Sequence, residues 1–138
     1  MRVVDYQRAT IVPDITGTIA TTLTFDGGGG TTGSITLTAQ RRGQYVTLQI
    51  PAVTGTSGTG STALVSNTAL AAAFRPLVNQ FGVLVSIVNN NAAVAASGAV
   101  QIGTGGIVTL LRDSASTTFT NTSVCGTAQA QSVTYFVG

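Results

Sequence analysis

Alternation of apolar and polar residues with a period of two is the feature of this sequence that most constrains its fold. In residues 18–26, the side chains of Ile19, Leu23 and Phe25 fall on one face and those of Thr22 and Thr24 on the other. Because successive side chains of a β-strand point to opposite faces, this period is typical of half-buried strands and not of helices. Strand-like runs recur at residues 34–40, 44–51, 81–88, 99–103, 106–112 and 131–137.

Short runs of Gly, Asn, Ser and Asp separate these segments and are typical of turns. With a turn signal at a spacing of roughly ten residues, the chain predicts an all-β fold, an antiparallel β-sandwich of about eight to ten strands. Residues 69–74 have helix-forming composition, but Pro76 follows, so at most one helical turn or a short strand is expected there. Gly105 and Gly106 predict a tight hairpin.

The glycine-rich segment 25–34, FDGGGGTTGS, contains the GxGxxG spacing of a dinucleotide-binding loop. That loop requires a helix after its third glycine and an acidic residue about twenty positions further on. Here the alternating run 34–40 follows, and no acid occurs between Asp26 and Asp113. The segment is therefore predicted to be a connection between two strands, without a nucleotide.

The residue types present argue against catalysis. The sequence contains no His, Lys or Glu, so the common general bases other than Asp are missing. The four Asp residues are isolated from one another in the sequence, and a nucleophile–His pair cannot be built. Because Cys125 is the single cysteine, it excludes an intramolecular disulfide and a zinc site of several cysteines. We expect no enzyme, no cofactor and no metal.

Charge is scarce, at 7% of residues with a net charge of +2, and the six Arg are scattered along the chain. Nucleic-acid binding is disfavoured because no basic stripe is available to hold a phosphate backbone. Membrane insertion is also not expected, since about eighteen consecutive apolar residues occur nowhere. A surface solvated by hydroxyls and amides suits an all-β protein exposed on a virion or outside a cell.

Residues 1–16 are chemically distinct from the rest and form a candidate N-terminal arm for attachment or strand exchange, followed by the sandwich over 17–138. Arg2, Tyr6 and Arg8 are the candidate assembly residues of the arm. Because charged residues interrupt its apolar ones, the arm is not expected to be a signal peptide, which predicts synthesis in a cytosol.

Candidate binding residues lie at the predicted strand ends, where loops on a rigid scaffold often carry recognition. Each has a plainer alternative, since Asn favours turns and Arg112–Asp113 can form a local ion pair. The candidates for a receptor-facing surface are Asn89, Asn90, Asn91, Arg112, Asp113 and Asn121.

About two-thirds of the chain, residues 43–137, resembles the C-terminal head domain of tail fibres and other virion appendages of phages and large DNA viruses. The pattern comprises a strand ending in proline, a Phe/Tyr-Arg-Pro segment, a valine-rich strand, a glycine-turn hairpin, a Phe-Thr loop and a closing Ser-Val-Thr-Tyr strand. The matching positions are Pro51, Phe74-Arg75-Pro76, Gly98 to Leu111, Phe119-Thr120, Gly126 and Ser132 to Tyr135.

The resemblance implies a jelly-roll sandwich like those of tumour-necrosis-factor and complement-head domains, assembled as a homotrimer on the virion exterior. It implies a structural and adhesive role that includes contact with host-surface glycan or protein, and contact of the arm with other virion proteins. It transfers no catalytic or binding residue. The short arm leaves a fibre head, a spike head, a capsid decoration protein and a minor capsid component as equal alternatives.

Residues 81–88, FGVLVSIV, are apolar on both faces, with Phe81, Val83, Val85 and Ile87 on one side and Leu84 on the other. A second apolar face predicts either packing against another subunit or a central strand covered by a loop. Two other classes of function remain open, a self-assembling shell or filament subunit and a soluble carbohydrate-binding module.

Overall fold

A computed structural model describes residues 14–94 and 96–138 of the chain. Antiparallel strands in three sheets, with one short 3₁₀ turn, make up its regular structure, so the prediction of an all-β antiparallel sandwich is confirmed. The strands are β1 (Ile15–Thr21), β2 (Leu23–Phe25), β3 (Ile35–Arg42), β4 (Tyr45–Ile50), β5 (Val53–Thr56), β6 (Ala63–Ser66), β7 (Gln80–Leu84), β8 (Ile87–Asn89), β9 (Ala92–Val94), β10 (Gly98–Ile102), β11 (Val108–Leu111), β12 (Val124–Thr127) and β13 (Gln131–Phe136). The assembly candidates Arg2, Tyr6 and Arg8 lie outside the described residues.

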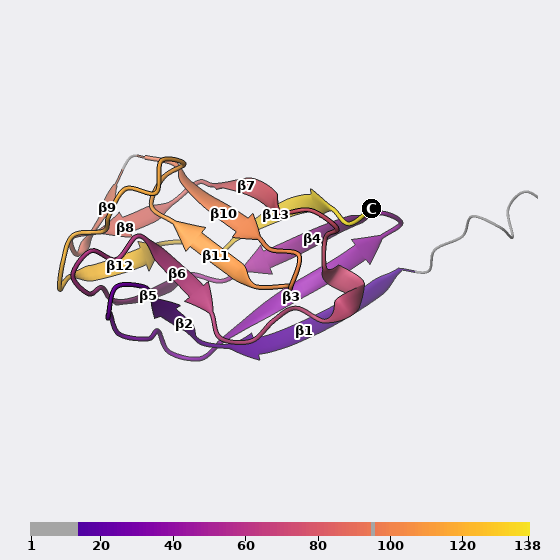
Figure 1. The fold of residues 1–138 in the computed structure, drawn as a ribbon, viewed down its shortest axis with the longest axis horizontal. Coiled ribbons are helices and arrows are strands. Elements are labelled where there is room, and N and C mark those ends of the chain that lie inside the picture. Colours follow the sequence, from indigo (N-terminus) through magenta and orange to yellow (C-terminus); the bar gives the residue numbers. More distant parts are fainter. Residues whose placement is uncertain (1–13, 95) are drawn as a thin grey trace, which may run out of the picture.

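The three sheets form two layers. Sheet A has the order β1-β3-β4-β13 and sheet C the order β5-β12-β8-β9. Two neighbouring chain paths, β4–β5 and β12–β13, run from sheet A into sheet C, so we describe these two sheets as one layer, which β1–β2 and β7–β8 connect to sheet B. Sheet B, with the order β2-β6-β11-β10-β7, forms the other layer. In Figure 1 the strands β6, β11 and β10 lie across the centre of the molecule, with β12 at the left and β4 at the right.

The described residues contain thirteen strands, more than the eight to ten expected, because long strands are interrupted where they bend. β1 and β2 are separated by Thr22 alone, and β4 and β5 by Pro51 and Ala52. β7 and β8, and likewise β12 and β13, are separated by two and three residues. Counted as continuous paths, these four pairs reduce the total to nine.

One hydrophobic core lies between the layers, and the apolar residues of the predicted alternating strands form it. Ile19, Leu23 and Phe25 are buried as expected, and the β4 residues Val46, Leu48 and Ile50 are at most 1% exposed. The ring of Phe25 meets that of Phe119 edge-on, with 5.6 Å between the ring centroids. Burial of such side chains is the main stabilising contribution expected for this fold.

Four strands of sheet B form a Greek key. β7, β10 and β11 follow one another as antiparallel neighbours, and β6, which precedes them in the chain, pairs with the far side of β11. The connection from β6 to β7 contains the single 3₁₀ turn, Ala72–Phe74. This turn agrees with the prediction of at most one helical turn in residues 69–74. In the described part of the chain no helix is long or apolar enough to cross a membrane.

Positions of the resemblance motif contact one another in the structure. The Tyr135 hydroxyl donates a hydrogen bond of 2.7 Å to the carbonyl oxygen of Phe74. Arg75 Nε donates a hydrogen bond of 2.7 Å to the carbonyl oxygen of Leu70. The N–H of Leu70 in turn donates to the carbonyl oxygen of Gly106, in the predicted hairpin. Burial raises the pKa of Tyr135, which stays a neutral donor. These motif residues therefore tie the long β6–β7 connection to the two layers.

Glutamine side chains bridge the two layers at the β7 edge. β7 and β13 lie side by side, and Gln131 Oε1 accepts a hydrogen bond of 2.7 Å from the N–H of Val85. Gln80 Oε1 accepts one of 3.4 Å from the N–H of Phe136. Side-chain amides thus join backbone N–H groups at a boundary between layers.

Candidate functional site

The predicted receptor-facing residues occur in loops, but the structure gives most of them a local task. Asn89 is a correction, because it is 7% exposed and does not face the outside. Its Nδ2 donates a hydrogen bond of 3.0 Å to Thr120 Oγ1, and its Oδ1 accepts one of 2.8 Å from the Thr120 N–H. Its Oδ1 also lies 3.4 Å from the buried thiol of Cys125. Asn89 therefore fastens the loop before β12 to the end of β8.

Asn90 and Asn91 form the two-residue turn between β8 and β9. Both have positive φ, 54° and 63°, which is the combination of a type I′ hairpin turn and a common conformation for Asn. Both are exposed. The side-chain oxygen of Asn91 accepts a hydrogen bond of 2.8 Å from the N–H of Val124, so this hairpin is held against β12.

Arg112 and Asp113 organise the loop that follows β11. Arg112 Nη1 donates a hydrogen bond of 2.6 Å to the carbonyl oxygen of Thr118. Asp113 Oδ1 accepts bonds of 2.9 and 3.0 Å from the N–H groups of Ala115 and Thr117. Hydrogen bonds from Thr117 lower the pKa of Asp113 below its usual value, so it is a carboxylate at neutral pH.

Asn121 connects the same loop to the one between β5 and β6. Its Oδ1 accepts a hydrogen bond of 3.1 Å from the N–H of Gly60. The structure therefore brings Asn89 and Asn121 together through Thr120, while Arg112 and Asp113 hold the start of that loop. Apart from Asn90, whose role is the turn, each candidate uses its side chain to hold a loop in place, Arg112 and Asp113 within their own loop and the three other Asn against a neighbouring segment.

The segment FDGGGGTTGS connects β2 to β3 as predicted and packs against the β5–β6 loop. The backbones of Gly29 and Gly58 lie so close that a Cβ on either would overlap the other loop. Asp26 joins the two loops, because its Oδ1 accepts bonds of 2.6 and 2.9 Å from the N–H groups of Thr62 and Ala63. Its Oδ2 accepts one of 2.5 Å from Thr62 Oγ1.

Asp26 is expected to make the loops sensitive to acid. Partial burial raises its pKa, but the hydrogen bonds from Thr62 and Ala63 together outweigh this and lower the pKa below 3.8. Because the pKa is lowered by folding, the carboxylate stabilises the fold above about pH 4 and loses this effect as the pH falls through the folded pKa.

Asp26→Asn is expected to cost about 1 kcal/mol at pH 7, a value reduced because the site is exposed to water. Urea unfolding of the wild type and the variant at pH 7 and at about pH 2.5 measures the difference, which should shrink in acid as the carboxylate is protonated. Asp14→Asn, at an exposed pair 3.9 Å from Arg42, is the control. A difference for Asp26→Asn that does not change with pH would contradict the assignment.

Five of the eight large hydrophobic residues that are exposed in the described part of the chain lie in or beside β7. We call Leu77, Val78, Phe81, Val83 and Val85 the β7 apolar surface. Their exposed fractions are 78%, 63%, 66%, 63% and 73%. Leu84 on the opposite face is fully buried. The sequence left two alternatives for residues 81–88, packing against another subunit or cover by a loop. No loop of the described residues covers the outer face of β7, so the second alternative does not apply to this face.

The prediction that Phe81, Val83, Val85 and Ile87 share one face is wrong for Ile87. Its side chain is 1% exposed, whereas the three others face the solvent. The strand is interrupted at Val85 and Ser86 between β7 and β8, and the side-chain alternation changes register there. β8 then buries all three of its residues. The apolar surface ends at this bend.

A hollow of about 630 Å³ adjoins the β7 apolar surface. Its lining combines apolar groups from three neighbouring strands of sheet B, among them Phe81, Val83, Ala99 and Leu111. Asp113, Ser114 and Ser116 form a polar border. The chain thus carries exposed apolar side chains next to a partly apolar depression.

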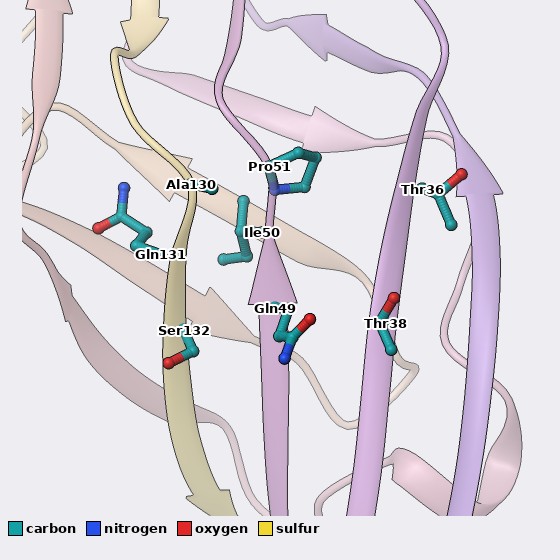
Figure 2. Close-up of a pocket in the computed structure, with 8 residues that line it drawn as sticks. All are labelled: Thr36, Thr38, Gln49, Ile50, Pro51, Ala130, Gln131 and Ser132. Carbon is teal, nitrogen blue, oxygen red and sulfur yellow. The ribbon is translucent and has the colours of Figure 1, made fainter.

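A second hollow, of about 370 Å³, lies on the outer face of sheet A, and we call it the polar hollow. Figure 2 shows Thr36 and Thr38 on one side, Gln49 in the middle and Ser132 on the other. Ile50, Pro51, Ala130 and Gln131 complete the lining, which contains no charged residue. The sequence did not identify this place, because the residues come from three strands and meet only through the pairing register.

Neither hollow holds the groups that catalysis or metal binding usually needs. Asp113 is the only ionisable side chain lining either of them. Across residues 14–94 and 96–138, no three His, Cys, Asp or Glu side chains are grouped so that they could hold a metal ion.

No protein-family model matches this sequence, and no curated protein matches it either.

Proposed function

We propose that this chain is a non-enzymatic structural protein of a virus particle, a homotrimeric jelly-roll head of a fibre, spike or capsid-bound appendage that contributes to attachment to the host surface. It would be made in the host cytoplasm and displayed on the particle exterior. Its N-terminal arm, with Arg2, Tyr6 and Arg8, would contact other virion proteins.

The observation that carries the proposal is the β7 apolar surface. Isolated exposed apolar residues are ordinary, but five large ones within nine residues of the chain, Leu77 to Val85, are typical of an interaction site. Tyr45 and Phe136, 58% and 40% exposed and packed edge-on at 5.4 Å, form a separate aromatic pair on the outer face of sheet A.

A second copy of the chain is the partner that this surface favours. The protruding residues Leu77 and Val78 and the hollow beside Phe81 lie on the same chain, so one copy can insert into the next. A contact between two different patches of the same molecule generates a closed ring when its rotation closes, and a trimer is one such ring.

The fold and the composition support the remaining parts of the proposal. The Greek key of β6, β11, β10 and β7 is the unit from which jelly rolls are built. The motif residues Phe74, Arg75 and Tyr135 all act in holding the fold, as expected of positions common to a structural family. An uncharged hydroxyl surface suits exposure on a particle.

Light scattering of the purified full chain tests the proposal. The expected mass is three times that of the 13.9 kDa chain and does not change on dilution to the micromolar range. A single-chain mass would overturn the trimer. Open polymers in electron micrographs would favour the shell or filament alternative, and labelled antibodies on particles then distinguish a protruding head from a capsid decoration protein.

A further inference from the structure

We infer that the polar hollow on the outer face of sheet A is a binding site for a neutral saccharide. The inference deepens the proposed attachment function by naming a ligand class and a place for it. It moves the candidate recognition site from the loops to the surface formed by β3, β4 and β13.

Four of the polar side chains that line the hollow are available to a ligand, while the fifth, Gln131, already accepts the Val85 N–H. Within the described residues, Thr36, Thr38, Gln49 and Ser132 have no side-chain hydrogen-bond partner, whereas the neighbouring hydroxyls of Thr47 and Thr134 bond to each other at 3.0 Å. Hydroxyl and amide groups both donate and accept, which matches the hydroxyls of a sugar.

The backbone adds further groups. β3 pairs with β1 along residues 35–41, but it pairs with β4 only from Thr38 onward. β4 ends at Ile50, and Pro51 then takes the chain towards sheet C. Because a strand directs its N–H and C=O groups alternately to its two sides, the edge of β3 beside Pro51 offers backbone groups that no strand satisfies.

Size and polarity select the ligand class. The volume of about 370 Å³ is in the lower part of the range of about 300–1,000 Å³ typical of small-ligand sites. Pro51 and Ala130 give apolar contact for the C–H groups of a sugar ring, and charged groups are missing from the lining. A neutral saccharide fits these features, and a charged one would lose its solvation without gaining a partner.

Saccharide titrations followed by amide NMR test the inference on the full chain. The probes are glucose, galactose, mannose, N-acetylglucosamine and their disaccharides up to about 20 mM, with glucuronate and sialic acid as charged comparisons. At least one neutral probe is expected to shift amides of residues 36–38, 49–50 and 130–132. The same sugar displayed on beads separates recognition of a surface glycan from recognition of the free sugar alone.

Two variants locate the binding. Thr38→Val with Gln49→Leu should weaken the Kd about five- to tenfold, since each removes a hydrogen bond to the ligand. Ser132→Ala, at an exposed hydroxyl, is a second variant with little risk to folding. The control is Thr47→Val with Thr134→Val, on the same face but outside the hollow, and its Kd should match the wild type.

The inference is overturned if no neutral probe shifts these amides, if the shifts map elsewhere, or if Thr38→Val with Gln49→Leu and Ser132→Ala all keep the wild-type Kd. Preference for the charged probes would also overturn it. Light scattering is a separate measurement, so a trimer without saccharide binding refutes the hollow alone, and a monomer that binds refutes the trimer alone.

Discussion

Replacing Phe81 and Val83 with serine is expected to reduce the mass in solution from that of the proposed trimer to that of one chain. Both side chains are more than 60% exposed in the single chain, so the fold loses little by the change. An interface loses much more, because buried aromatic and aliphatic anchors contribute most of the energy of association. We expect the trimer to dissociate at micromolar concentration, as measured by light scattering and sedimentation.

A matched control is Val124→Ser, which makes the same kind of change at a residue that is 39% exposed in β12, away from the β7 apolar surface. It should leave the mass of the assembly unchanged. Circular dichroism of the double variant should retain the β-sheet spectrum. A double variant that remains trimeric would show that β7 is not the interface.

Gly126→Ala is expected to lower the free energy of unfolding by about 3 kcal/mol or more. Gly126 lies in the middle of sheet C, opposite Thr54 on one side and Val88 on the other. Its φ of 143° is unfavourable for alanine, and the added Cβ would overlap the carbonyl oxygen of Val53. The atoms that the Cβ would meet belong to Val53 and Thr54, which cannot move away without breaking the pairing of β5 with β12. Urea unfolding measures the change.

Gly105→Ala is the control for this prediction. A Cβ at Gly105 meets no atom within 4 Å, and its φ is not in the positive range, so the variant should stay within about 0.5 kcal/mol of the wild type. If Gly126→Ala unfolds at the same urea concentration as the wild type, the packing described around β12 is incorrect. A variant that is recovered only as aggregate agrees with the expected loss.

The sequence predicted the strands well where one face was polar. In β4, Val46, Leu48 and Ile50 alternate with Thr47 and Gln49, and only one assignment of inside and outside buries the apolar set. In residues 81–88 both faces are apolar, so periodicity could not decide which one is buried. The bend at Ser86 also changes the register, and no residue type announces it.

The binding candidates were harder to predict, because the sequence around an Asn in a turn is the same whether its side chain binds a ligand or holds the loop by hydrogen bonds. Asn89 and Asn121 proved to bond to Thr120 and Gly60, partners about thirty and sixty residues away in the sequence. The polar hollow depends on the register that places Thr38 opposite Gln49 and Ser132 opposite Gln49 on its other side. Only the pairing of three strands shows that these residues are neighbours.

The shared layer of sheets A and C has a consequence for the order in which the chain can fold during synthesis. The last path of the sequence, β12 followed by β13, lies between β4–β5 on one side and β8 and β7 on the other. The central strand of this layer therefore leaves the ribosome after every strand that must pair with it. Until then β4 and β5 keep an open edge, so completion of the layer, and with it any assembly through β7, follows the synthesis of β12 and β13.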